Sequence, residues 1–114
     1  MNLFEEALKG SINAVRILKS NQKKSDSDIF VFPNDVAAVI KMYLQQKISA
    51  SDLKEWASLI LSVESYICPN WENYELADRY QPMWDILQRL EMPAIHGQIS
   101  ASIAETYLQK LDSI

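Results

Sequence analysis

The sequence predicts an all-α fold, in which residues 1–114 form a single domain built as a compact bundle of five or six amphipathic helices. Apolar residues recur at steps of three and four along most of the chain, which is the pattern of helices with one buried face. Only two glycines and four prolines interrupt the 114 residues, so the helices should be long. Apolar residues make up 48% of the chain, and a chain of this length can bury about two-thirds of its unfolded surface.

The first helix is expected over residues 3–20, with apolar side chains on one face and basic side chains on the other. The polar residues 20–28 that follow are typical of a loop. Residues 29–32 should be extended, either as a short strand or as a cover over the core, because four residues without a visible pairing partner support a sheet only weakly. The buried face of the first helix should consist of Phe4, Leu8, Ile12, Val15 and Leu18.

Two further helices have recognisable starts. Asn34 or Asp35 can cap the second helix. Ser49 and Asp52 form a capping box, in which each side chain accepts a hydrogen bond from the backbone N–H of the other residue, and the third helix should then run to about Ile67. The buried face of the third helix should carry Leu53, Trp56, Ala57, Ile60 and either Val63 or Ile67.

Residues 71–91 also have a helical pattern, but Pro82 lies inside them. Because proline suits the first turn of a helix and breaks its interior, we expect two segments joined by a sharp bend. Pro93 should end the second segment. The last helix should start after a short turn, at Ser100 or at a second capping box on Ser102, which makes a helical hairpin. The second segment should bury Met83, Ile86, Leu87 and Leu90, and the last helix Ile103, Tyr107, Leu108 and Leu111.

The charge of the chain favours a protein partner. Fifteen carboxylates against eleven basic side chains give a net charge of −4, and residues 48–114 alone carry a net charge of −6. Such a surface repels nucleic acid and anionic lipid but attracts a basic protein. No apolar run reaches the roughly 18 residues needed to cross a bilayer. Because there is no secretory signal and Cys68 is the only cysteine, we expect a cytoplasmic location.

The sequence contains no recognisable catalytic, cofactor or metal motif, so we expect neither an enzyme nor a bound cofactor or metal. Cys68 and His96 are the only residues of their types, and nothing in the pattern pairs them as nucleophile and base. Both glycines are isolated, which excludes a phosphate-binding loop. Glu72, Glu75 and Asp78 can share a helix face and act as acid and base, but a solvated acidic face is the more frequent outcome. A small helical enzyme is therefore the least favoured interpretation.

Residues 64–91 mix acidic and aromatic side chains, which suits protein recognition better than catalysis. Trp56 and Trp84 lie in apolar stripes and should belong to the core. Trp71 stands among polar residues and is the better surface anchor, because interface hot spots favour Trp and Tyr. The predicted partner-binding residues are Glu64, Trp71, Glu72, Tyr74, Glu75, Asp78 and Asp85.

Two segments resemble small all-helical bacterial immunity proteins. Residues 89–100, Arg-Leu-Glu-Met-Pro-Ala-Ile-His-Gly-Gln-Ile-Ser, look like the approach to the last helix of that family, and residues 48–57, Ile-Ser-Ala-Ser-Asp-Leu-Lys-Glu-Trp-Ala, are similar to its middle helix. The resemblance covers residues 48–111 and includes the helix positions Ala104, Leu108 and Leu111. Proteins of this kind accompany colicin-like toxins and the toxic domains of contact-dependent growth inhibition systems.

The resemblance implies an antitoxin that binds the C-terminal domain of a cognate toxin, which is expected to be a nuclease and specifically an RNase. The acidic surface would then cover the basic active-site cleft in place of the nucleic acid. On this interpretation the predicted partner-binding residues are toxin-binding residues, and the protein itself contacts neither nucleic acid nor membrane. The alternative is a helical adaptor or regulatory domain that binds another basic protein.

Overall fold

A computed structural model describes residues 3–21, 28–69 and 73–114. Within these residues, five helices have ten or more residues, which confirms the predicted all-α bundle. None of the described helices is long and apolar enough to span a lipid bilayer. The helices are α1 (Leu3–Leu8), α2 (Ile12–Asn21), α3 (Pro33–Leu44), α4 (Ala50–Ser62), α5 (Tyr74–Asp78), α6 (Gln81–Glu91), α7 (Pro93–His96) and α8 (Ala101–Asp112), and the two strands are β1 (Ile29–Phe30) and β2 (Tyr66–Ile67).

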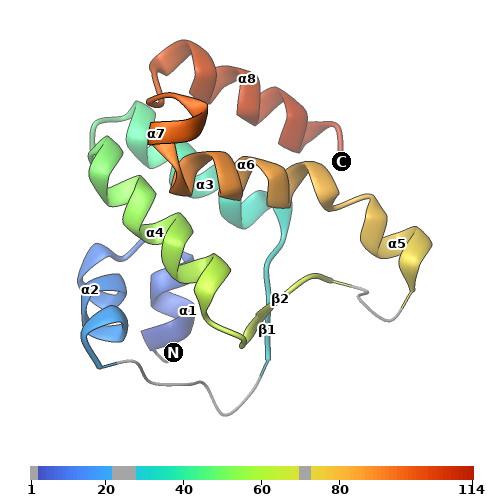
Figure 1. Cartoon of the computed structure of the whole chain (residues 1–114), viewed down its shortest axis with the longest axis horizontal. Helices are drawn as coiled ribbons and strands as arrows, with labels where there is room; N and C mark the ends of the chain where they lie inside the picture. The colour runs from blue at the N-terminus through green and yellow to red at the C-terminus, as the bar shows by residue number, and fades with distance from the viewer. Residues whose placement is uncertain (1–2, 22–27, 70–72) are drawn as a thin grey trace.

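The bundle is organised around α4. This helix packs mainly against α6, α3 packs against α8, and α1 packs against α2 (Figure 1). The pair of α1 and α2 lies at one end of the molecule and α8 at the other, with α4 and α6 between them (Figure 1). The largest fully buried side chains come from the predicted apolar stripes and a few neighbours: Trp56, Ile40, Leu53, Leu59, Ile60, Met83, Ile86, Leu87, Val15, Val31, Val36 and Val39.

The predicted first helix over residues 3–20 is wrong in one respect, because the chain breaks at Gly10 into α1 and α2. Gly10 has φ +96°. Its N–H donates to the carbonyl of Ala7 and the N–H of Ser11 donates to that of Glu6, both at 3.0 Å. This is the Schellman arrangement, which ends a helix at a glycine in the left-handed region. Of the predicted buried face, Phe4, Leu8, Val15 and Leu18 are buried and Ile12 is half-buried.

We expect the substitution Gly10→Ala to lower the free energy of unfolding by about 1–3 kcal/mol, because alanine at this φ is strained. A Cβ at this position would lie 2.8 Å from the Sδ atom of Met42. That thioether is flexible and can move, so the backbone conformation should account for most of the cost. Gly10→Ala should therefore keep most of its effect in a Met42→Ala background, as measured by urea denaturation. A cost that disappears in that background would show that the contact, and not the backbone, requires glycine.

The third helix was expected to reach Ile67, but α4 ends at Ser62 and residues 66–67 form β2 instead. The strands run parallel, with Ile29 opposite Tyr66. The N–H of Ile29 donates to the carbonyl of Ser65 at 2.7 Å. The extended segment at 29–32 therefore contains a short strand. It also covers the core, because Val31 is fully buried.

The capping residues show which predicted helix starts are correct. The box of Ser49 and Asp52 is present, with hydrogen bonds of 3.1 and 3.0 Å. Neither predicted cap of the second helix is correct. That helix begins at Pro33, the N-cap is Phe32, and Asp35 instead accepts from the N–H of Phe32 at 2.9 Å.

The C-terminal hairpin is largely as predicted. Pro82 lies in the first turn of α6, and the bend before it separates α5 from α6. The expected turn after Pro93 is the four-residue helix α7. Ser100, and not Ser102, caps α8 by accepting from the N–H of Ile103 at 3.3 Å. Ile103 is 37% exposed, contrary to prediction, because α8 places Ala104 and Leu111 in the core and leaves Tyr107 and Leu108 half-buried.

Two buried side chains hold α1 against the rest of the bundle. The hydroxyl of Tyr66 donates to the carbonyl of Phe4 at 2.6 Å, and the Nε1 of Trp56 donates to the carbonyl of Leu8 at 3.3 Å. The two aromatic rings of Phe4 and Tyr66 also contact each other, with their centroids 6.3 Å apart. Each buried donor thus has a backbone acceptor, and among the described residues no buried side-chain nitrogen or oxygen lacks a hydrogen-bond partner.

Substitution of Tyr66 by Phe should lower the free energy of unfolding by about 0.5–1.5 kcal/mol at neutral pH, because it removes the buried hydrogen bond to the carbonyl of Phe4. Burial raises the pKa of Tyr66 above its ordinary value near 10.0. Its contribution to stability is therefore complete below about pH 10 and falls as the pH rises further, since the unfolded chain ionises first. The stability difference between the wild type and Tyr66→Phe should narrow above that pH, as measured by denaturation at several pH values. A constant difference would contradict this.

Candidate interaction surface

The predicted acidic surface includes α5, a helix of five residues that extends away from the start of α6 (Figure 1). The side-chain oxygen of Asn73 accepts from the N–H of Glu75 at 3.0 Å and fixes the start of the helix. The thiol of Cys68 contacts the carbonyl of Ala77 at 3.8 Å and connects α5 to the chain that follows β2. Glu75 and Asp78 are exposed and lie three positions apart, so α5 presents both carboxylates on one face.

Asp85 continues the acidic surface onto α6. It is exposed and accepts a hydrogen bond from the Nε2 atom of Gln81 at 2.9 Å. Arg89 lies one turn further along the helix, but no ion pair joins it to any residue in the described ranges. The carboxylate of Asp85 is therefore hydrogen-bonded to a neutral side chain and remains exposed to solvent.

The remaining predicted residues are placed only in part. Glu64 is exposed in the turn between α4 and β2, whereas Glu75 and Asp78 belong to α5. Trp71 and Glu72 lie outside the residues that the structure describes, as does the side chain of Tyr74. The structure thus brings Glu75 and Asp78 together, with Asp85 on the adjoining helix.

The net charge of the chain originates in this region. Residues 64–91 contain six carboxylates and two arginines, a net charge of −4 that equals the net charge of the whole protein. Glu75 and Asp78 form no ion pair with a residue that the structure places. The acidic surface is therefore not neutralised by the described part of its own chain.

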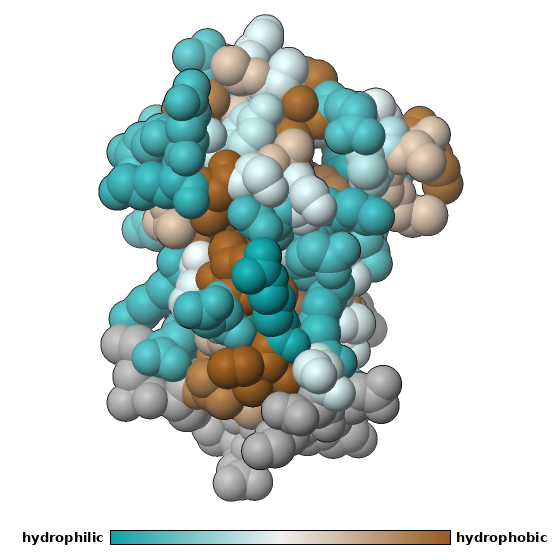
Figure 2. Space-filling model, turned by 90° about the vertical axis from the view of Figure 1, so that its left-hand side faces the viewer, coloured by the Kyte–Doolittle hydropathy of each residue, from teal (hydrophilic) through white to brown (hydrophobic). Residues whose placement is uncertain are grey.

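The side formed by α2 and α4 is different, because its carboxylates are paired. Arg16 lies 3.7 Å from Asp52, and Lys19 forms an ion pair with Glu55. Figure 2 shows this side as a mostly hydrophilic surface with smaller hydrophobic areas between the charged groups. These two ion pairs connect α2 to α4, so this face is less suited to attracting a basic partner than α5.

Cys68 and His96 do not form a nucleophile–base pair. His96 is exposed in α7, whereas Cys68 is half-buried after β2, and Figure 1 places these segments in different parts of the molecule. Among the residues that the structure describes, no group of three or more histidine, cysteine or acidic side chains could hold a metal ion. Trp56 is fully buried and Trp84 is half-buried against the core, in agreement with the prediction for both.

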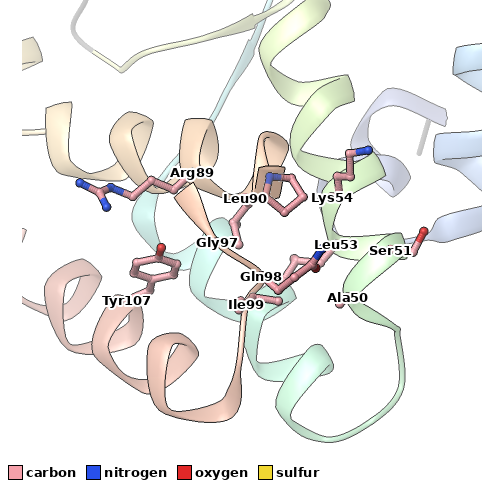
Figure 3. A pocket seen from close by; sticks show the side chains of 11 residues that line it. Ala50, Ser51, Leu53, Lys54, Arg89, Leu90, Gly97, Gln98, Ile99 and Tyr107 are labelled. Atoms are coloured by element: carbon pink, nitrogen blue, oxygen red, sulfur yellow. The ribbon is translucent and has the colours of Figure 1, made fainter. Parts of the chain in front are cut away.

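A cavity of about 260 Å³ is one feature that the sequence did not indicate. It lies between the start of α4, the end of α6, the loop at 97–99 and α8 (Figure 3). Lys54 and Arg89 line it together with Tyr107, and no carboxylate does so. Local patterns gave no signal for it, because its walls combine the start of α4 with segments that lie at least 35 positions further along the chain.

Two features of the described part of the chain are candidates for recognition. One is the acidic surface on α5 and α6, and the other is the cavity with cationic side chains at its border. In comparisons with known proteins, no family model, curated protein or solved structure matches this chain.

Proposed function

We propose that this protein is an immunity protein, which binds the C-terminal domain of a cognate toxin and neutralises it. It acts by binding and not by catalysis. The observation that supports this proposal is the concentration of the whole net charge in residues 64–91, where Glu75, Asp78 and Asp85 are exposed. The sequence resemblance of residues 48–111 to small helical immunity proteins points to the same class.

The proposed toxin is a nuclease, in particular an RNase, because a nuclease must hold a polyanion in a basic cleft. Carboxylates at the spacing of a short helix can occupy such a cleft in place of phosphates. Charge attraction also accelerates the encounter, up to about 10⁸–10⁹ M⁻¹s⁻¹ at low salt. An immunity protein benefits from this speed because a single free toxin molecule can cleave many substrates.

We place the proposed activity in the cytoplasm, where the nucleic acid substrates of such a toxin lie. A free thiol at Cys68 is compatible with a reducing compartment. The exposed carboxylates of α5 and α6 would face the toxin. Trp71, Glu72 and Tyr74 belong to the same proposed surface on the grounds of sequence alone.

A helical adaptor that binds another basic protein is the second candidate, and the same exposed carboxylates favour it. The two candidates differ in whether the protein protects cells against a toxin. An adaptor should bind its partner without protecting cells against any toxin.

The test is co-expression of this chain with the toxin domain encoded in the neighbouring reading frame, followed by growth measurement and co-purification. An immunity protein should restore growth and form a stable complex with the toxin domain. Restored growth should be accompanied by loss of nuclease activity in the purified complex. Binding without protection would support the adaptor, and the absence of both would contradict the proposal.

A further inference from the structure

The cavity between α4, α6 and α8 has an apolar floor and a polar border. Leu53 is fully buried and Leu90 nearly so, and Ile99 completes the apolar lining. Figure 3 shows Arg89 and Tyr107 at one side of the cavity and Lys54 and Ser51 at the other, with Leu90, Gln98 and Ile99 between them. A ligand in this space would contact hydrocarbon below and cationic or hydrogen-bonding groups at the border.

The charged side chains at the border of the cavity are all positive. Lys54 and Arg89 are the only charged residues among those lining the cavity, and both are exposed. No ion pair joins either of them to another residue in the described ranges. The carboxylates of α4 are directed elsewhere, because Asp52 and Glu55 pair with α2. In a protein with a net charge of −4, this is a local site for negative charge.

Several neutral hydrogen-bonding groups accompany the two cations. Ser51, Gln98 and Tyr107 line the cavity and can donate to an anion. The wall formed by the loop at 97–99 is anchored, because the hydroxyl of Tyr43 on α3 donates to the carbonyl of Ile99 at 3.4 Å. The border can therefore supply both charge and directed donors to a ligand.

We propose that this cavity binds a small organic anion, with its carboxylate or phosphate group on the side of Arg89 and Tyr107 (Figure 3) and its apolar body on Leu53 and Leu90. The volume of about 260 Å³ is suited to one ring that carries one acid group. Sites for drug-sized ligands usually measure about 300–1,000 Å³, so we expect a ligand smaller than these. This site adjoins the acidic surface, since Arg89 lies one turn from Asp85 on α6, but it does not depend on the proposed toxin binding.

The test is titration of the ¹⁵N-labelled protein, followed by NMR, with three probes of similar size: phenyl phosphate, benzoate and neutral benzamide. Both anions should shift the backbone amide signals of Leu53 and Gly97–Ile99 saturably, and the neutral probe should not. The anion that binds with the higher affinity shows whether the site prefers phosphate or carboxylate. Saturable shifts of equal size with benzamide would show that charge is not recognised and would overturn the proposal.

Matched charge variants complete the test. Arg89→Gln should weaken binding of the preferred anion about tenfold, because hydrogen bonds to charged groups contribute on this scale. Lys110→Gln removes the same charge from an exposed position on α8 outside the cavity and should leave the affinity unchanged. Equal weakening by both variants, or no saturable shift with either anion, would overturn the proposed site. The amide spectra also show directly that each variant is folded.

Discussion

Substitution of Trp56 by alanine is expected to lower the free energy of unfolding by about 3–5 kcal/mol. Trp56 is 0% exposed in the middle of α4, between α1 and α6, and it is the largest fully buried side chain. Its removal leaves a cavity that the neighbouring helices cannot close. It also removes the hydrogen bond from Nε1 to the carbonyl of Leu8. Because small domains are stable by only about 5–15 kcal/mol, this loss should be visible as a large fall in the thermal midpoint.

Two further variants separate the causes of the Trp56 effect. Leu87→Ala removes a fully buried side chain from the opposite helix α6 and should cost about 2–5 kcal/mol without loss of a hydrogen bond. Gln88→Ala changes the next residue, which is exposed, and should stay within about 0.5 kcal/mol of the wild type. Denaturant unfolding followed by circular dichroism measures all three. A near-neutral result for Trp56→Ala would mean that α4 does not form the centre of the core.

The parts of the fold that the sequence predicted are those determined by nearby residues. The box of Ser49 and Asp52 acts across three positions, and Pro82 fixes the first turn of α6 by its own ring. The break at Gly10 was missed because the three- and four-residue spacing of apolar side chains continues through it. The buried side chains of α1 and α2 therefore follow the pattern of one continuous helix. Strand β2 was missed because its partner Ile29 lies far away in the sequence.

The candidate sites show the same difference between features that nearby residues determine and features that arise only when distant segments pack together. Exposure of Glu75 and Asp78 was predictable, because unpaired carboxylates are too costly to bury. The border of the cavity was not predictable, since Lys54 and Arg89 come to line one cavity only after α4 and α6 have packed together. Neither residue carries a local signal that separates it from an ordinary solvated charge.

Reversal of the charges of α5 should slow association with the proposed toxin strongly while leaving the fold intact. Glu75→Lys and Asp78→Lys each add two positive charges, so together they bring the net charge from −4 to 0. Electrostatic steering raises association rates by about 10–10³-fold, and most of this gain should be lost. The triple variant with Glu72→Lys should lose more. Stopped-flow measurement of the association rate and an assay of growth protection test the double and the triple variant.

The matched control reverses two carboxylates elsewhere. Glu105→Lys and Asp112→Lys are exposed on α8 and change the net charge by the same amount. If the surface of α5 contacts the toxin, the control should retain most of the association rate, because the field near a short patch decays over about 10 Å at 0.1 M salt. Equal slowing by both pairs would mean that only total charge matters. A wild-type complex that forms equally fast at about 1 M salt, where charges are screened within roughly 3 Å, would rule out charge attraction as the basis of recognition.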